Sequence, residues 1–69
     1  MKIVEQTIRI QERTSDIQAE HSTECLFQVF VKGRLQDRNT YFIKGQTINF
    51  GFDCLVPGDL VQLFFLISK

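Results

Sequence analysis

The alternation of apolar and polar residues along the chain predicts an all-β protein. The most apolar run covers residues 60–67, where Gln62 is the only polar side chain. Eight residues suit a strand better than a helix, and the run follows the turn-forming sequence Val56-Pro57-Gly58-Asp59. We expect this strand to be buried on both faces, either at the centre of a curled sheet or between the core and a second subunit.

Four other segments alternate with a period of two residues, which is typical of half-exposed strands. They cover residues 3–13, 24–32, 40–44 and 46–53. The first directs Val4, Gln6, Ile8, Ile10 and Glu12 inward and several charged residues outward, as suits an edge strand. The second has one wholly apolar face, composed of Cys25, Phe27, Val29 and Val31. Its other face carries Leu26 and Phe30 beside polar residues.

The segments between these strands are polar. Residues 14–23 lose the apolar signal, so we expect a polar, mobile loop there. The spacing of Ser15 and Gln18 resembles a capping box, which would permit one helical turn near residues 15–21. Residues 33–39 contain glycine, aspartate and asparagine, and are expected to form a turn.

Together these segments predict one small β domain over residues 1–69. The expected architecture is a five-stranded antiparallel meander, forming a curled sheet or a barrel of the size of OB and SH3 domains, or a curled two-layer sandwich. A chain of 69 residues buries only about 60% of the surface that it exposes when unfolded. Oligomerisation is therefore expected, because a core of this size gives marginal stability.

Charge and cysteine content narrow the classes of partner and compartment. Eight basic and eight acidic residues give a formal net charge of zero, which offers no overall attraction to nucleic acid or to an anionic membrane. No apolar run is long enough to span a membrane or to form a signal peptide, so we expect a cytoplasmic protein without membrane association. Cys25 and Cys54 are expected to be buried thiols rather than a disulfide.

The sequence offers little material for catalysis. His21 is the only histidine and lies in the polar loop, where we expect it to be solvated. No metal-binding spacing, nucleotide-binding glycine motif or nucleophile with a matched base is present. We therefore expect no catalytic residue, no metal and no cofactor.

The surplus of apolar strand faces favours a non-catalytic interaction module that binds an unidentified protein partner and self-associates. The candidate oligomer interface consists of Leu26, Phe30, Val61, Leu63, Phe65 and Ile67.

Two alternatives stay open. Basic and aromatic residues gather between positions 32 and 44, which would suit a single-stranded nucleic-acid binder of the OB type, although the neutral charge balance does not favour it. Its surface would consist of Lys32, Arg34, Arg38, Tyr41, Phe42 and Lys44. A weaker alternative is a small-ligand pocket at a subunit interface, with polar groups from loop 14–23.

Overall fold

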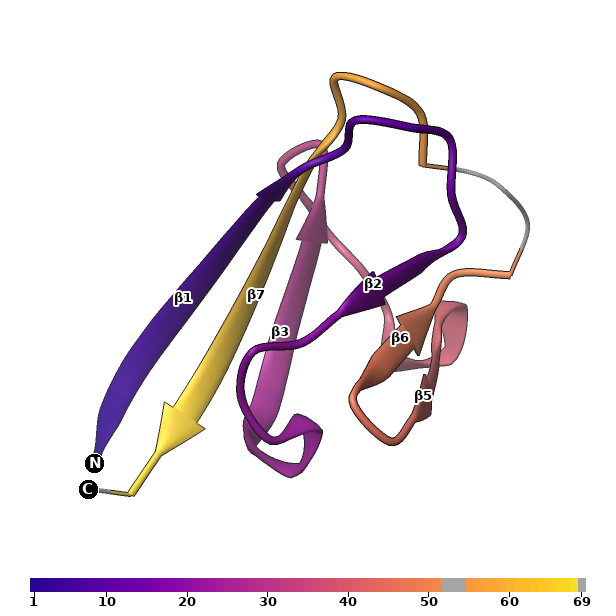
Figure 1. Ribbon diagram of the computed structural model, residues 1–69. Coiled ribbons are helices and arrows are strands. Elements are labelled where there is room, and N and C mark those ends of the chain that lie inside the picture. Colours follow the sequence, from indigo (N-terminus) through magenta and orange to yellow (C-terminus); the bar gives the residue numbers. More distant parts are fainter. Residues whose placement is uncertain (52–54, 69) are drawn as a thin grey trace.

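The chain forms two antiparallel sheets that pack face to face (Figure 1). The structure, a computed structural model, describes residues 1–51 and 55–68. In the described part the four-stranded sheet has the order β1-β7-β3-β4, and the three-stranded sheet has the order β2-β6-β5. The strands are β1 (Lys2–Arg9), β2 (Asp16–Gln18), β3 (Leu26–Val31), β4 (Arg34–Leu35), β5 (Phe42–Lys44), β6 (Thr47–Asn49) and β7 (Leu60–Ile67). Two short 3-10 turns are η1 (Thr23–Cys25) and η2 (Arg38–Thr40).

Strand β7 confirms the prediction made from the most apolar run. It lies between β1 and β3 and pairs with both of them in antiparallel register. One of its faces is buried, since Val61, Leu63 and Phe65 are all 0% exposed and Ile67 is half-buried. The other face is half-buried at Phe64 and 39% exposed at Leu66. The expectation of two buried faces is therefore met on one side only in the single chain.

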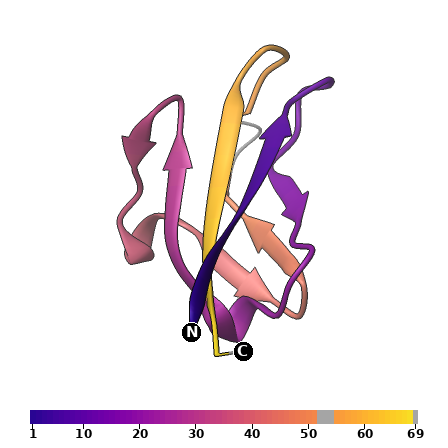
Figure 2. The same cartoon turned by 90° about the vertical axis from the view of Figure 1, so that its left-hand side faces the viewer.

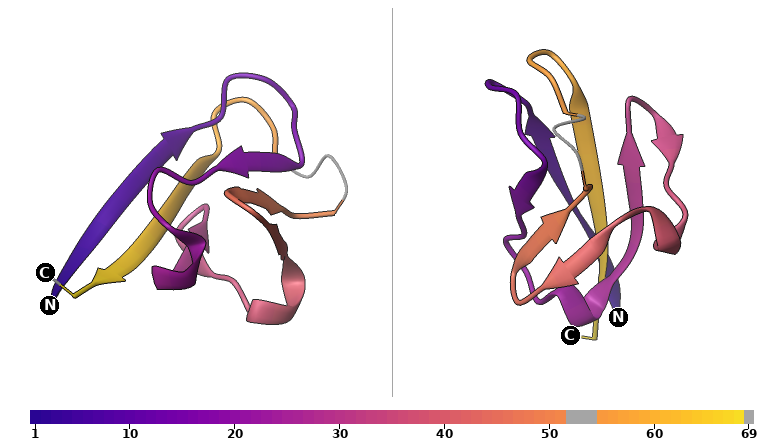
Figure 3. Two further views of the ribbon diagram at one scale, coloured as in Figure 1. Left: turned by 60° about the horizontal axis from the view of Figure 1, so that its bottom comes forward. Right: turned by 90° about the vertical axis from the view of Figure 1, so that its right-hand side faces the viewer.

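All five predicted strands are present, but their arrangement differs from a meander. Because β7 inserts between β1 and β3, the last strand of the chain occupies the middle of the larger sheet. Two further strands, β2 and β4, contain only three and two residues. The two sheets do not close into a barrel, and β2 lies with β6 rather than beside β1 (Figure 3).

The segment predicted as a polar loop is in part a strand. Ile17 and Ala19 are 6% and 5% exposed, so β2 and the residue after it contribute to the core. The predicted helical turn near residues 15–21 is wrong, and the short helical turn lies later, in η1. Gln46 ties the segment to the β5–β6 turn, because its Nε2 donates hydrogen bonds to the carbonyl oxygens of Ala19 and His21 at 3.0 and 2.9 Å.

The tight turns follow from residues that tolerate positive φ. Lys32 and Gly33 join β3 to β4 with φ of 57° and 78°, the combination that a two-residue type I′ hairpin requires. The turn before β7 is confirmed as predicted: Gly58 has φ of 96°, and Asp59 Oδ2 accepts a hydrogen bond from Val56 N at 3.0 Å.

The hydrophobic core lies between the sheets. Apart from β7, the four-stranded sheet contributes Val29, which is 0% exposed, and the three-stranded sheet contributes Ile48, also 0% exposed. Leu55 is fully buried as well. It forms an isolated β-bridge with Thr14, which links the segment before β7 to the segment between β1 and β2. The predicted strand over residues 46–53 extends only over Thr47–Asn49 in the described part, and residues 52 and 53 of that prediction lie outside the described residues.

A buried glutamine links the two sheets where β1 and β2 form no ladder. Gln6 is 7% exposed, and its Nε2 donates a hydrogen bond to Gln18 O at 3.0 Å. Its Oε1 accepts a hydrogen bond from Glu20 N at 2.8 Å. One side chain therefore supplies the two hydrogen bonds that a neighbouring backbone would otherwise make, which explains why a polar residue is tolerated on the inner face.

We predict that Gln6→Leu lowers the free energy of unfolding by about 1–3 kcal/mol, because it leaves a partly buried carbonyl and a partly buried amide without partners. Urea denaturation followed by circular dichroism measures the change. The matched control is Gln62→Leu on β7, whose amide donates only to the exposed Glu5. Equal effects of the two substitutions would contradict the linking role of Gln6.

Candidate interaction surfaces

The face of the four-stranded sheet that points away from the core is the main candidate surface, and we call it the outer face (Figure 2). Its residues follow from the register, since directly opposed residues share a face. On β7 the buried face carries Val61, Leu63 and Phe65, so the alternate positions and their partners point outward. The outer face consists of Ile3, Glu5, Thr7, Arg9, Gln28, Phe30, Leu35, Leu60, Gln62, Phe64 and Leu66.

Apolar side chains occupy much of the outer face. Ile3 and Leu66 lie opposite each other on β1 and β7 and are 62% and 39% exposed. Phe30 on β3 packs edge-on against Phe64 on β7, with ring centroids 5.5 Å apart and an interplanar angle of 75°. Leu35, opposite Phe30, is 60% exposed. These residues form an apolar surface across all four strands.

A small polar network lies within this apolar surface. Glu5 Oε2 accepts hydrogen bonds from Thr7 Oγ1 at 2.6 Å and from Gln62 Nε2 at 3.1 Å. The hydrogen bond from Thr7, followed by that from Gln62, holds the pKa of the Glu5 carboxyl below its usual value. The ionised form of Glu5 is therefore favoured over the protonated form. Glu5 lies near the middle of β1, an edge strand of the four-stranded sheet.

The structure separates the six residues predicted as an oligomer interface. Val61, Leu63 and Phe65 belong to the core and cannot reach a partner in this structure. Leu26 and Ile67 are half-buried and pack against the same core. Phe30 alone lies on the outer face. The accessible side chains of β7 are those at the alternate positions, which include Phe64 and Leu66.

A β-bulge explains why Leu26 faces the core. Leu26 pairs with Phe65, whereas Gln28 pairs with Phe64, so β3 holds one extra residue between these pairs. The extra residue is Phe27, predicted on the apolar inner face but 44% exposed. The alternation of side chains is therefore interrupted at the start of β3. Leu26 points to the core and Phe27 points to solvent, the reverse of the prediction.

The residues predicted to contact nucleic acid do not form one platform. Tyr41 is 5% exposed and packs in the core beside Phe50, with ring centroids 5.9 Å apart. Arg38 lies over the Tyr41 ring at 5.2 Å and donates a hydrogen bond to Tyr41 O at 3.2 Å. Tyr41 therefore cannot stack on a base while the core is intact.

The remaining members of that set lie on different elements. Phe42, 67% exposed, shares β5 with the exposed Lys44, on the outward side of the three-stranded sheet. Lys32 and Arg34 lie instead at the β3–β4 hairpin of the other sheet. Lys32 Nζ also lies 3.7 Å from Asp59 Oδ1, so part of its charge is compensated within the chain.

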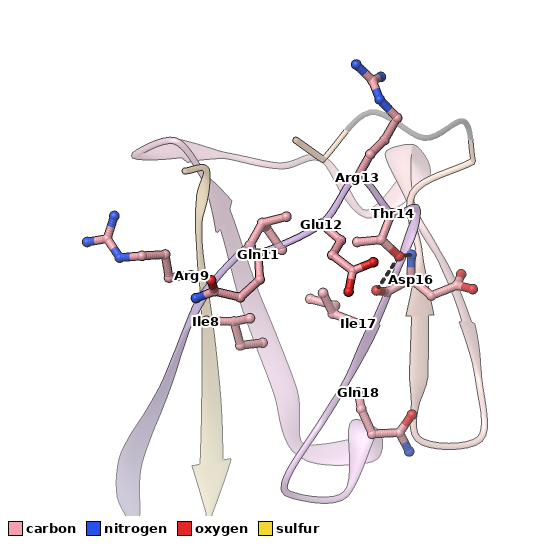
Figure 4. Close-up of a pocket in the computed structure, with 10 residues that line it drawn as sticks. Ile8, Arg9, Gln11, Glu12, Arg13, Thr14, Asp16, Ile17 and Gln18 are labelled. Carbon is pink, nitrogen blue, oxygen red and sulfur yellow. Dashed lines mark hydrogen bonds between the residues drawn. The ribbon is translucent and has the colours of Figure 1, made fainter. Parts of the chain in front are cut away.

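An open pocket of about 520 Å³ lies where the chain crosses from β1 to β2 (Figure 4). Ile8, Ile10 and Ile17 give it apolar walls, and Glu12 extends toward Ile17 whereas Arg9 and Arg13 point away. Thr14 and Asp16 are bound to each other at its rim, since Thr14 Oγ1 accepts a hydrogen bond from Asp16 N at 3.1 Å. Part of the loop predicted to reach a small ligand therefore lines this pocket.

Two chemically active side chains, His21 and Cys25, pack beside the core. His21 is half-buried and packs edge-on against Phe65 at 5.1 Å, so it is not the solvated loop residue that we expected. Cys25 is a free thiol that packs beside the core. Among residues 1–51 and 55–68 no group of three or more His, Cys, Asp or Glu side chains could hold a metal. The same residues contain no helix of the length and apolarity needed to cross a bilayer.

We predict that Thr7→Val raises the pKa of Glu5 toward the ordinary value of 4.5, because it removes the main hydrogen bond to the carboxylate. A two-dimensional NMR titration of the side-chain carboxyl measures the change. A lowered folded-state pKa stabilises the fold above the unfolded value, and this contribution is lost as the pH falls through the folded value. Thr47→Val on the other sheet is the control, and an equal response to both would contradict the assignment.

Comparison with known proteins adds no family to this geometry. No family model, no curated protein and no solved structure matches the chain. Its function has to be argued from the surfaces described above.

Proposed function

We propose that this protein is a non-catalytic β interaction module, which binds protein partners, second copies of itself included, through the outer face. The carrying observation is that large apolar side chains are exposed on that face, whereas the core is complete without them. Ile3, Leu35 and Leu66 are 39–62% exposed, and Phe65 and Leu63 on the opposite side are 0% exposed. Contiguous exposed apolar surface of this kind is typical of interaction sites.

The size of the outer face indicates a weak rather than a permanent interface. The four strands contain eight, eight, six and two residues, which at about 3.3 Å along and 4.8 Å across the strand give a projected area on the order of 400 Å². A stable interface buries about 800 Å² of accessible surface on each partner. We therefore infer a transient contact, with Gln62, Thr7 and Glu5 keeping the face soluble between encounters.

We predict that the wild-type chain self-associates at high micromolar concentration and that Leu66→Lys reduces this association at least about tenfold, because a charge would be buried in the contact. Sedimentation velocity over a concentration series measures the effect. Phe42→Lys is the matched control, since it makes the same kind of change at an exposed aromatic residue of the other sheet.

Two outcomes would contradict binding of a second copy by the outer face. One is a strict monomer at every concentration, and the other is equal weakening by Leu66→Lys and Phe42→Lys. Circular dichroism of both variants checks that they remain folded.

A second candidate function is binding of single-stranded nucleic acid by the three-stranded sheet. It is supported by Phe42, which is 67% exposed and shares the face of β5 with Lys44. It is opposed by the buried Tyr41 and by Asp16, which lies in the same cross-strand row as Phe42 through Asn49. A single aromatic residue beside one cation would give weak binding without sequence preference.

For this second candidate we expect weak binding of labelled oligonucleotides at low salt, lost as salt rises and lost in Phe42→Ala, because stacking and phosphate contacts would both be needed. Fluorescence anisotropy measures it, and Phe64→Ala on the other sheet is the control. No change in anisotropy at the lowest salt would eliminate nucleic-acid binding.

A further inference from the structure

Strand β1 is the longest edge strand in the described part of the chain. The four-stranded sheet ends at β1 on one side and at β4 on the other, and the three-stranded sheet ends at β2 and β5. Of these four edges, β1 has eight residues, whereas β2, β4 and β5 have two or three. In Figure 1 no other strand lies beside β1 on the side away from β7, and β2, which Figure 2 shows on that side, belongs to the other sheet and forms no ladder with β1. A long unpaired edge is a template for a further strand.

The hydrogen bonds at the end of β1 show which of its backbone groups face the free side. Ile10 N donates to Asp59 O, and Ile10 O accepts from Gly58 N, both at 2.9 Å, so Ile10 faces β7. On the other side of β7, Lys32 N donates to Leu60 O, which is consistent with the same alternation. The residues whose N–H and C=O groups face outward are therefore Ile3, Glu5, Thr7 and Arg9.

Charge distinguishes the registers in which two copies of β1 could pair symmetrically. The outward groups must meet, so an odd-numbered residue of one copy lies opposite an odd-numbered residue of the other. With Glu5 on the two-fold axis, two carboxylates oppose each other, which is unfavourable. With Gln6 on the axis, Glu5 opposes Thr7 and Arg9 opposes Ile3. With Thr7 on the axis, Glu5 of each copy opposes Arg9 of the other.

We propose that a second copy of this chain adds to the free edge of β1 in antiparallel orientation, with Thr7 at the two-fold axis and two reciprocal Glu5–Arg9 pairs. The exposed side chains of Glu5 and Arg9 lie on the outer face of the same strand, so both pairs form on one side of the joined sheet. The chain has no net charge, so the two copies do not repel each other.

This edge contact is separate from binding at the outer face and extends what that face can do. A two-fold axis perpendicular to the sheet keeps both outer faces on the same side of a continuous eight-stranded sheet. The joined face would double to a projected area on the order of 800 Å². A single-chain face that is too small for a stable contact would thereby reach the standard size.

A charge-exchange experiment tests the register. We expect Glu5→Arg and Arg9→Glu each to raise the dimer dissociation constant at least about tenfold in sedimentation velocity, because each places two like-charged pairs across the axis. A mixture of the two variants should form a heterodimer, since one chain then carries two arginines and the other two glutamates. The double variant Glu5→Arg/Arg9→Glu should dimerise by itself.

Hydrogen exchange gives an independent measurement on the wild-type chain. As the concentration rises, the amides of Glu5, Thr7 and Arg9 should become protected, whereas those of Gln6 and Ile8 should be protected already in the monomer by β7. Association through the outer face alone would leave the amides of Glu5, Thr7 and Arg9 exchanging at the monomer rate. That pattern overturns the edge proposal and leaves the proposed function standing.

Three further results would overturn the proposal. They are a wild-type chain that stays monomeric, a dimer that tolerates both single charge changes, and a mixture of the two variants that does not associate. Conversely, a dimer that responds to the charge exchange but not to Leu66→Lys would support the edge contact and contradict binding of a second copy at the outer face.

Discussion

The pairing of β7 with both β1 and β3 is the constraint on which the rest of the structure depends. β1 and β3 do not pair with each other, so the four-stranded sheet exists only because the last strand lies between them. β7 can occupy this position because Val61, Leu63 and Phe65 are apolar and completely buried on one side. Their burial fixes the register, since a shift by one residue would place Gln62 and Phe64 in the core instead. The composition of the outer face follows from the same register.

A side-chain amide, rather than a ladder, joins the two sheets at the open side. Gln6 connects β1 to the end of β2 and to Glu20, whereas Gln46 holds the same segment within its own sheet, at the β5–β6 turn. This arrangement satisfies buried backbone groups without requiring β1 and β2 to pair. It also leaves the edge of β1 free, because Gln6 reaches across the inner face and not across the edge. The open sandwich and the unpaired edge therefore have the same origin.

The sequence predicted the long strands well because each shows a clear pattern beside a recognisable turn. β1 was found from its period of two, β7 from an apolar run of eight residues, and the turn at Pro57-Gly58-Asp59 from residues that tolerate its backbone angles. The order of the strands could not be predicted from the sequence, because the apolar run of β7 does not show that this strand lies between β1 and β3. β2 and β4 were missed because three or two residues are too few to show a period.

The interaction surface was only partly predicted, although one residue of the sequence indicates which face of β7 is exposed. Gln62 is the single polar residue in the run of β7, and it marks the side that faces water, so Phe64 and Leu66 could have been assigned to the outer face. The bulge in β3 could not be found in this way, because Leu26 and Phe27 are both apolar and their exchange leaves the pattern unchanged. A period of two therefore separates the faces reliably only where at least one side carries a polar residue.

The charges on β1 illustrate how an edge strand can exclude most partners and still accept one. Glu5 and Arg9 disfavour addition of an arbitrary apolar strand, because pairing would desolvate both charges without a counter-charge. The same two residues compensate each other when the added strand is β1 itself in the register centred on Thr7. Each exposed pair contributes at most about 1 kcal/mol, so the charges select the register rather than drive the association. The driving force would come from the backbone hydrogen bonds of the edge and from cross-strand contacts of the side chains beside it.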